Sequence, residues 1–360
     1  MSHTDEIRAT IGDLLAYHRW ANGKLLGLCR PLDDDQLDRE EPIGPGSLRK
    51  TLFHVWAAES LWLSRWKGTS PTSFPVEDGI PIDELAARFE MLHAARDAFL
   101  VEENPKDYSR VVPYRNLAGE AYTNSLVNLL MHVLNHAVHH RAQMMHFLKL
   151  NGVKIPGGLD YIFYRIAVPT VAMPEPQRER LKGFGLEVGE SLAPAIFHSP
   201  ELLRLYFDYG DWGMDRLLTH ASSLSDADLD RDFGMGIGTY RKTLLHVYDA
   251  ENWWRNNWRG AKKTFERLPP ETSIAELRER WAEVSSDRSA TLASLVAEGL
   301  ATPVEADFGA GPMVFRISES MLQLGVHGTH HRAQATNMLR RLGVSTKPTD
   351  LVVFIRETGR

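Results

Sequence analysis

Apolar residues recur along the chain at the three- and four-residue intervals typical of amphipathic helices. Leu14 and Leu15 are followed at this spacing by Ala21, Leu25 and Leu26, which would give one helix an apolar face. The same pattern predicts four long helices in each half of the chain, at residues 5–29, 47–67, 82–103 and 124–150 and at residues 199–221, 239–259, 273–299 and 318–341. We therefore expect an all-α protein, with two four-helix bundles as its simplest architecture.

Capping residues and short extended segments support these bounds. Thr123 stands where the fourth helix is expected to begin, Ser199 precedes a proline suited to the first helical position, and Ser273 begins a capping box. Between the third and fourth helices of each half, residues 111–114 and 307–315 combine apolar residues with turn signals. We predict short extended segments there.

The two halves of the chain are copies of one another. Residues 46–55 recur as residues 238–247, at an offset of 192 positions, and residues 139–143 recur as residues 330–334, at an offset of 191. The matches run in order through most of each half. We therefore expect a tandem repeat of one helical domain, with a first copy and a second copy.

A stretch rich in proline and glycine joins the copies. Its density of these residues, over residues 152–198, argues against one long helix. We expect the first domain at residues 1–168, a connector at residues 169–198 and the second domain at residues 199–360.

Composition and charge exclude several classes of protein. The 360-residue chain has a formal net charge of −6, so it lacks the basic surplus of a dedicated nucleic-acid binder. Its single cysteine permits neither an internal disulfide nor a thiolate-rich metal site. Neither a secretion signal nor an apolar run of about 18 residues is present, so we expect a soluble cytoplasmic protein without a membrane span.

The repeat separates informative histidines from the rest. The chain has 15 histidines, but only four positions are histidine in both copies. These pairs are His54/His246, His136/His327, His139/His330 and His140/His331.

The spacing of the histidines shared by the two copies is that of a metal site. His136 and His140 lie four residues apart, so on a helix their side chains share one face, about 40° apart. His54 lies on another long helix, from which a bundle can aim it at the same point. Three imidazoles leave positions open for substrate, and without a thiolate they favour Zn²⁺ or Ni²⁺ over Fe²⁺ and Mn²⁺. The predicted ligands are His54, His136 and His140 in the first copy and His246, His327 and His331 in the second.

Other residues near these histidines permit more than one interpretation. His139 and His330 could also serve as ligands, although a supporting or surface position is favoured for both. Gln143 lies near the same helix face and could orient a ligand or a water molecule. The tryptophans of the first copy are expected to belong to the core.

Several catalytic motifs are missing. The sequence after His136 lacks the glutamate of the zinc-protease helix. We find neither a GxSxG nucleophile elbow nor a phosphate-binding glycine loop followed by lysine. Serine hydrolase, zinc protease and P-loop chemistry are therefore not indicated.

At these motifs the chain resembles the DinB/YfiT-like family. The likeness rests on residues 135–143 and 326–334, on residues 51–56 and 243–248, and on residues 17–22 of the first predicted helix. It covers nearly all of both copies. The resemblance implies four-helix bundles in which three histidines hold a divalent metal, and the six predicted ligands match those positions. Because such proteins often pair as dimers, it also implies that the two copies form an internal pseudo-dimer.

The resemblance also suggests classes of activity. The superfamily includes transferases and isomerases that use a low-molecular-weight thiol, and proteins described as metal-dependent hydrolases. The second copy departs from the first around residues 308–316, so its pocket is expected to differ.

The sequence favours a metal-dependent enzyme that acts on a small molecule. An open three-histidine site can activate a thiol for transfer, or water for hydrolysis, by lowering its pKa. No acidic residue lies on the histidine face to act as a base, which favours thiol chemistry. The alternative is a non-catalytic module in which the metal serves stability or captures a small ligand.

Overall fold

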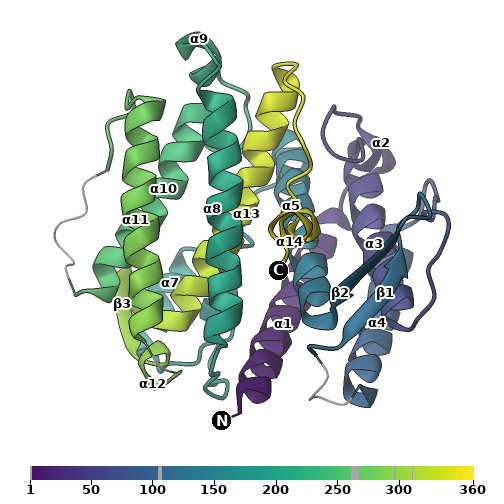
Figure 1. Cartoon of the computed structure of the whole chain (residues 1–360), viewed down its shortest axis with the longest axis horizontal. Helices are drawn as coiled ribbons and strands as arrows, with labels where there is room; N and C mark the ends of the chain where they lie inside the picture. The colour runs from purple at the N-terminus through teal and green to yellow at the C-terminus, as the bar shows by residue number, and fades with distance from the viewer. Residues whose placement is uncertain (1, 104–107, 261–266, 296, 310) are drawn as a thin grey trace. The chain divides into compact units, whose positions relative to one another are not determined.

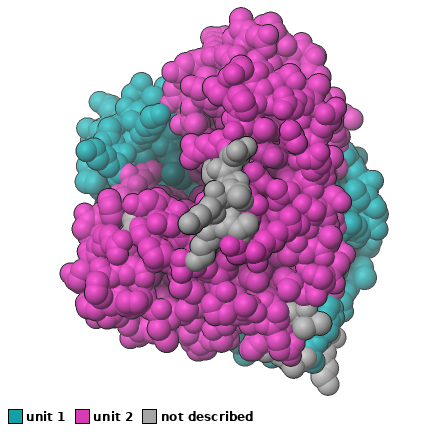
Figure 2. Space-filling view, turned by 90° about the vertical axis from the view of Figure 1, so that its left-hand side faces the viewer, with its two compact units in different colours: residues 1–154, 348–360 teal, residues 155–347 magenta. Residues whose placement is uncertain are grey.

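The chain folds into two compact units. The structure is a computed structural model that describes residues 2–103, 108–260, 267–295, 297–309 and 311–360. Unit 1 comprises residues 1–154 and 348–360, and unit 2 comprises residues 155–347 (Figure 2). Both are built from long helices with a small hairpin each, so the all-α prediction with two tandem bundles is confirmed.

Unit 1 is a four-helix bundle with three short additions. Helices α3 and α1 pack against α5 and against α4, which closes the bundle (Figure 1). The long helices are α1 (His3–Cys29), α3 (Leu48–Trp66), α4 (Ile82–Glu102) and α5 (Leu126–Leu150). The additions are α2 (Asp34–Asp38), a hairpin of β1 (Val111–Arg115) and β2 (Ala121–Ser125), and α14 (Leu351–Thr358).

Unit 2 repeats this plan. Helices α8 and α10 pack against α13 and against α11. The long helices are α8 (Pro200–Ala221), α10 (Tyr240–Trp258), α11 (Ile274–Ser294) and α13 (Ile317–Arg341). The shorter elements are α6 (Tyr161–Ala167), α7 (Glu175–Gly183), α9 (Asp226–Leu229), α12 (Ala297–Leu300), β3 (Pro303–Asp307) and β4 (Pro312–Arg316).

The predicted extended segments form antiparallel hairpins that lead into the last long helix of each bundle. Val111 pairs with Ser125 in unit 1, and Pro303 pairs with Arg316 in unit 2. The expected cap at Thr123 is wrong, because that residue lies within β2 and the side chain of Ser125 accepts the hydrogen bond that caps α5. The third helix of the second copy ends at residue 294 rather than 299, and residue 296 lies outside the described residues.

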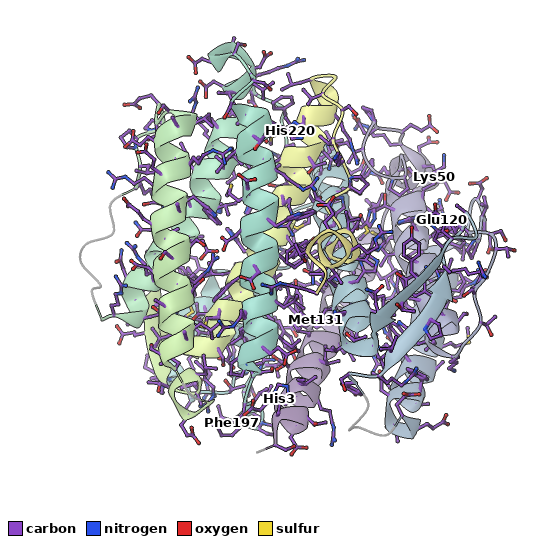
Figure 3. All side chains as sticks on the ribbon, in the orientation of Figure 1. His3, Lys50, Glu120, Met131, Phe197 and His220 are labelled. Carbon is purple, nitrogen blue, oxygen red and sulfur yellow. The ribbon has the colours of Figure 1, made fainter. Side chains whose placement is uncertain are left out.

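The helices are amphipathic, as their sequence pattern predicts. On α5, Met131 is fully buried, whereas Lys50 in the first turn of α3 is exposed (Figure 3).

Next to Lys50, the Arg49 guanidinium is buried and donates from Nε to Asp38 at 2.8 Å. Arg241 makes the equivalent bond to Asp230 at 2.9 Å. These pairs tie a short helix to the start of α3 or α10, the helix that carries the first histidine of each predicted triad.

The compact units do not follow the boundaries expected from the repeat. Residues 155–168, expected to close the first domain, belong to unit 2, where α6 packs on α13. Residues 348–360, the end of the second copy, belong to unit 1, where α14 packs on α5 (Figure 1). Part of the expected connector is the helix α7 of unit 2. Each bundle therefore contains a short helix that the sequence assigns to the other copy.

No helix in the described part of the chain is long and apolar enough to cross a membrane.

We expect Leu351→Ala to destabilise unit 1 by about 2–5 kcal/mol, because the side chain is fully buried on α14, the helix that packs on α5. Hydrogen exchange followed by mass spectrometry should show faster exchange in α5 and unchanged exchange in α13. Val352→Ala, at a partly exposed position of α14, is the control. Loss of protection in α13 instead of α5 would contradict the assignment of α14 to unit 1.

Candidate metal centres

In unit 1 the three predicted histidines meet inside the bundle. His54 extends from α3, and His136 and His140 extend from α5, one turn apart. The Nε2 atom of His136 lies 3.3 Å from that of His54 and 3.1 Å from that of His140. The ring centroids of His54 and His140 are 4.5 Å apart.

Unit 2 contains the same arrangement. The Nε2 atoms of His246 on α10 and His327 on α13 are 3.0 Å apart. The ring of His331 lies 4.7 Å from that of His246 and 4.4 Å from that of His327, measured between centroids. In each cluster one nitrogen per histidine lies within 4.8 Å of the others, so both clusters could hold a metal ion.

A glutamine fixes the tautomer of one histidine in each cluster. The Oε1 atom of Gln143 can only accept, so at 2.8 Å it requires the proton of His140 on Nδ1 and leaves the Nε2 lone pair facing the cluster. The amide nitrogen of Gln143 donates to Nε2 of His139 at 3.2 Å. Gln334 repeats both bonds with the histidines at 331 and 330, at 2.9 Å each. His139 and His330 thus hold the glutamine that orients a candidate ligand.

A glycine makes room for each glutamine. Gly44 and Gly236 have φ values of +55° and +52°, in the left-handed region that favours glycine. A Cβ atom at either position would collide with the Oε1 atom of Gln143 or Gln334. The glycines and glutamines are matched parts of both sites.

Burial keeps the six histidines neutral. Desolvation holds the pKa values of His136, His140 and His331 well below the ordinary value and lowers that of His327 to about 3. Neutral imidazole is the form that binds a metal. Three imidazole nitrogens within 4.8 Å of one another fit a divalent cation, which three nitrogen ligands would hold with positions left open.

The cluster of unit 2 borders a cavity of about 820 Å³, large enough for a small-molecule substrate. His246 and His327 belong to its wall. Most of the wall is apolar, and it includes Trp253, Trp254 and Phe308. The charged residues of the wall are Asp160, Asp249, Asp307 and Arg267.

Asp249 is a functional candidate that the sequence reasoning missed. It lies three residues after His246 on α10, and its Oδ1 atom is buried without a hydrogen-bond partner in the described part of the chain. Burial raises its pKa to about 6. The repeat hides this residue, because the first copy has Ala57 at the corresponding position. A search for polar residues present in one copy alone would have found it.

The cluster of unit 1 has different neighbours. Phe74 stacks on His54, with 5.1 Å between ring centroids. His132 lies one turn before His136 on α5, at 5.9 Å between centroids, where the second copy has Gln323. The expectation that the tryptophans of the first copy belong to the core holds for Trp62 and Trp66, which are buried, whereas Trp20 and Trp56 are only partly buried.

A third cluster, His18, Glu59 and His93, also has ligand atoms close together. It is a buried ion-pair network. Glu59 accepts from Arg96 at 2.7 Å through one oxygen and contacts His18 at 2.9 Å through the other. Because the guanidinium already neutralises the carboxylate, this cluster is poorly suited to a further cation.

Comparison with known sequences identifies the family. The DinB family model matches residues 1–174 and residues 199–360. The chain belongs to the DinB family. The two matches confirm the tandem copies of a DinB bundle, and the histidine clusters occupy equivalent positions in both. No curated protein and no solved structure matches the chain.

We expect the metal-free protein to lose stability as the pH falls below about 6.5, because the pKa of His93 is lowered by burial to about 3 in the folded state. The unfolded chain takes up the proton first, which costs about 2 kcal/mol between pH 7 and pH 5 for this one group. Urea unfolding in the presence of a chelator measures the difference.

His93→Gln is the matching variant. It should unfold more easily at pH 7, yet show a smaller loss of stability between pH 7 and pH 5. An unchanged pH dependence in this variant would show that His93 does not titrate as described.

Proposed function

We propose that the protein is a metal-dependent enzyme of the DinB family that transforms a small, largely apolar molecule in unit 2. The supporting observation is that the histidine cluster of this unit opens on the cavity of about 820 Å³. His246, His327 and His331 would hold the ion there, and His54, His136 and His140 would hold a second ion in unit 1. A divalent ion so held would activate a thiol or a water molecule by lowering its pKa.

The donor set determines which metals fit. Three neutral imidazole nitrogens without a thiolate suit Zn²⁺ or Ni²⁺ best, with Fe²⁺ and Mn²⁺ as weaker candidates. Both glutamine-fixed histidines present Nε2, the atom expected of a ligand whose Nδ1 is hydrogen-bonded.

The apolar wall favours an apolar or aromatic substrate. Trp253 and Phe308 pack with ring centroids 4.9 Å apart at the cavity surface. Arg267 offers a positive charge that can bind an anionic end of the same molecule. The net charge of −6 remains unfavourable for a nucleic-acid substrate.

Asp249 bears on the choice between thiol transfer and hydrolysis. Thiol chemistry was favoured because no acidic residue shares the helix face of the histidines, but Asp249 reaches the same cavity from α10. A carboxyl group with a pKa of about 6 is largely ionised at neutral pH and can accept a proton from either S–H or O–H. In transfer, the sulfur bonds to an electrophilic carbon, the bond from that carbon to its leaving group breaks, and the leaving group takes the proton from Asp249. In hydrolysis, the oxygen of water bonds to a carbonyl carbon, the bond from that carbon to the leaving oxygen or nitrogen breaks, and the leaving group takes the proton. Both reactions therefore remain within the proposal.

Full-length, tag-free protein loaded with Zn²⁺ or Ni²⁺ should hold about two ions per chain, because two clusters converge. His140→Ala and His331→Ala should each lose one, whereas His220→Ala at the end of α8 (Figure 3) should lose none. Elemental mass spectrometry makes the comparison. Failure of loaded wild-type protein to retain any ion would overturn the proposal.

We would screen electrophiles with cellular thiols, and esters and amides with water, using metal-loaded and chelated protein. Asp249→Asn should lower the rate of the active reaction by about 10²–10⁴-fold without loss of metal, since it removes the proton acceptor. Asp215→Asn, at an exposed ion pair on α8, is the control.

Chelation also tests the alternative of a non-catalytic module. Unfolding on chelation, together with no turnover in any screen, would favour a metal that serves stability or ligand capture. Turnover that persists in the chelated, folded protein would contradict metal dependence.

A further inference from the structure

Each unit contains an aspartate, at the start of a short helix, that comes from the other sequence copy. Asp160 precedes α6, which the sequence assigns to the first copy, yet it lines the cavity of unit 2 with His246 and His327. Asp350 precedes α14 at the end of the second copy and belongs to unit 1. The two residues therefore occupy equivalent positions in the two copies, and each lies in the unit formed mainly by the other copy.

Neither carboxylate performs the usual task of its position. Both residues are helix N-caps, where aspartate normally accepts a hydrogen bond from a backbone N–H of the first turn. The side chains of Asp160 and Asp350 make no such bond. By contrast, Asp33 caps α2 by accepting from the N–H of Gln36 at 2.8 Å. The helices α6 and α14, here called the exchanged helices, therefore lack a side-chain cap at the N-terminus. Their aspartate carboxylates can interact with other groups instead.

In unit 2 a glutamine holds the carboxylate against the helix of the histidines. Gln323 lies one turn before His327 on α13, and its amide nitrogen donates to Oδ2 of Asp160 at 3.3 Å. Its Oε1 atom accepts from the backbone N–H of Ile162 at 2.8 Å. This clamp fixes both the start of α6 and the acid at the edge of the cluster.

The charge of each aspartate acts on the histidines of its own unit. Burial lowers the pKa values of His246 and His327, and the negative charge of Asp160 opposes that effect on both. Asp350 opposes the burial effect on His54 and on His132 in the same way. A charge that favours a protonated imidazole also favours a divalent cation at the same place.

We propose that Asp160 and Asp350 are positioning residues that complete the metal centres crosswise, Asp160 at the centre of unit 2 and Asp350 at that of unit 1. Each supplies a negative charge beside three neutral imidazoles, which offsets part of the charge of the ion and orients its open positions. The inference rests on the proposed metal binding, not on the proposed reaction. It means that neither sequence copy contains all the groups of its own site.

Variants of the full-length chain that retain only one metal centre test whether each aspartate acts on the centre of its own unit. His140→Ala leaves only the centre of unit 2, and His331→Ala leaves only that of unit 1. In each background we would measure the affinity for Zn²⁺ by competition with a chelating indicator, after adding Asp160→Asn or Asp350→Asn. Asparagine keeps the size and the capping ability of aspartate and removes only its charge.

Asp160→Asn should weaken Zn²⁺ binding about tenfold or more in the His140→Ala background and leave the other background unchanged. Asp350→Asn should weaken Zn²⁺ binding in the His331→Ala background and leave binding in the His140→Ala background unchanged. Asp33→Asn is the control for unit 1 and Asp215→Asn for unit 2, and neither should shift either affinity more than about twofold. The visible spectrum of the Co²⁺-loaded protein should change only in the crossed combinations, which a purely structural role of the helices would not produce.

An effect on the centre of the same sequence copy, or no effect in either background, would overturn the inference. If Asp160→Asn unfolds unit 2, Asp160→Glu decides the matter: it restores charge, and affinity should recover. Crossed effects without any turnover would leave the inference standing and count against the proposed enzyme.

Discussion

Each centre depends on three imidazoles that stay neutral while their Nε2 atoms face one another inside a helical bundle. Burial meets the first condition, since it keeps the pKa of each ring below neutrality. Hydrogen bonds meet the second, because Gln143 and Gln334 fix the proton of one ring on Nδ1. Glycine at positions 44 and 236 then permits the glutamines to approach. The glycines, the glutamines and the histidines of each centre therefore serve one arrangement, in which three imidazole nitrogens lie close together.

The two copies retain this apparatus and differ around it. Unit 2 has Asp249 where the first copy has Ala57, and Gln323 where the first copy has His132. Unit 1 places Phe74 flat against His54. The groups that would hold an ion are thus duplicated, whereas the groups that would contact a substrate are not. Two centres with similar affinities for metal and different substrates, or one centre that is active alone, are both consistent with this division.

The sequence predicts the long helices, the hairpins and the six candidate ligands because these depend on local periodicity and on the repeat. It does not predict which bundle α6 and α14 join, since a short apolar helix can pack on either copy and its own periodicity is the same in both cases. The sequence also places the cap of the fourth helix wrongly at Thr123, because β2 continues through this residue and pairing with β1 prevails over the local preference of threonine for a cap. Asp249 escaped notice because a comparison of the copies keeps only what they share.

The exchanged helices link the centres to the stability of the bundles. Helices of seven and eight residues, such as α6 and α14, are not stable alone in water, so they form only when their apolar faces are buried. Leu351 and Tyr161 are fully buried on these faces, directly after the aspartates. The position of each carboxylate is therefore set by packing on α5 or α13, the same helices that carry two of the three histidines. Covalent linkage of the copies gives each exchanged segment a high effective concentration at its site, which separate single-copy chains would have to supply by association.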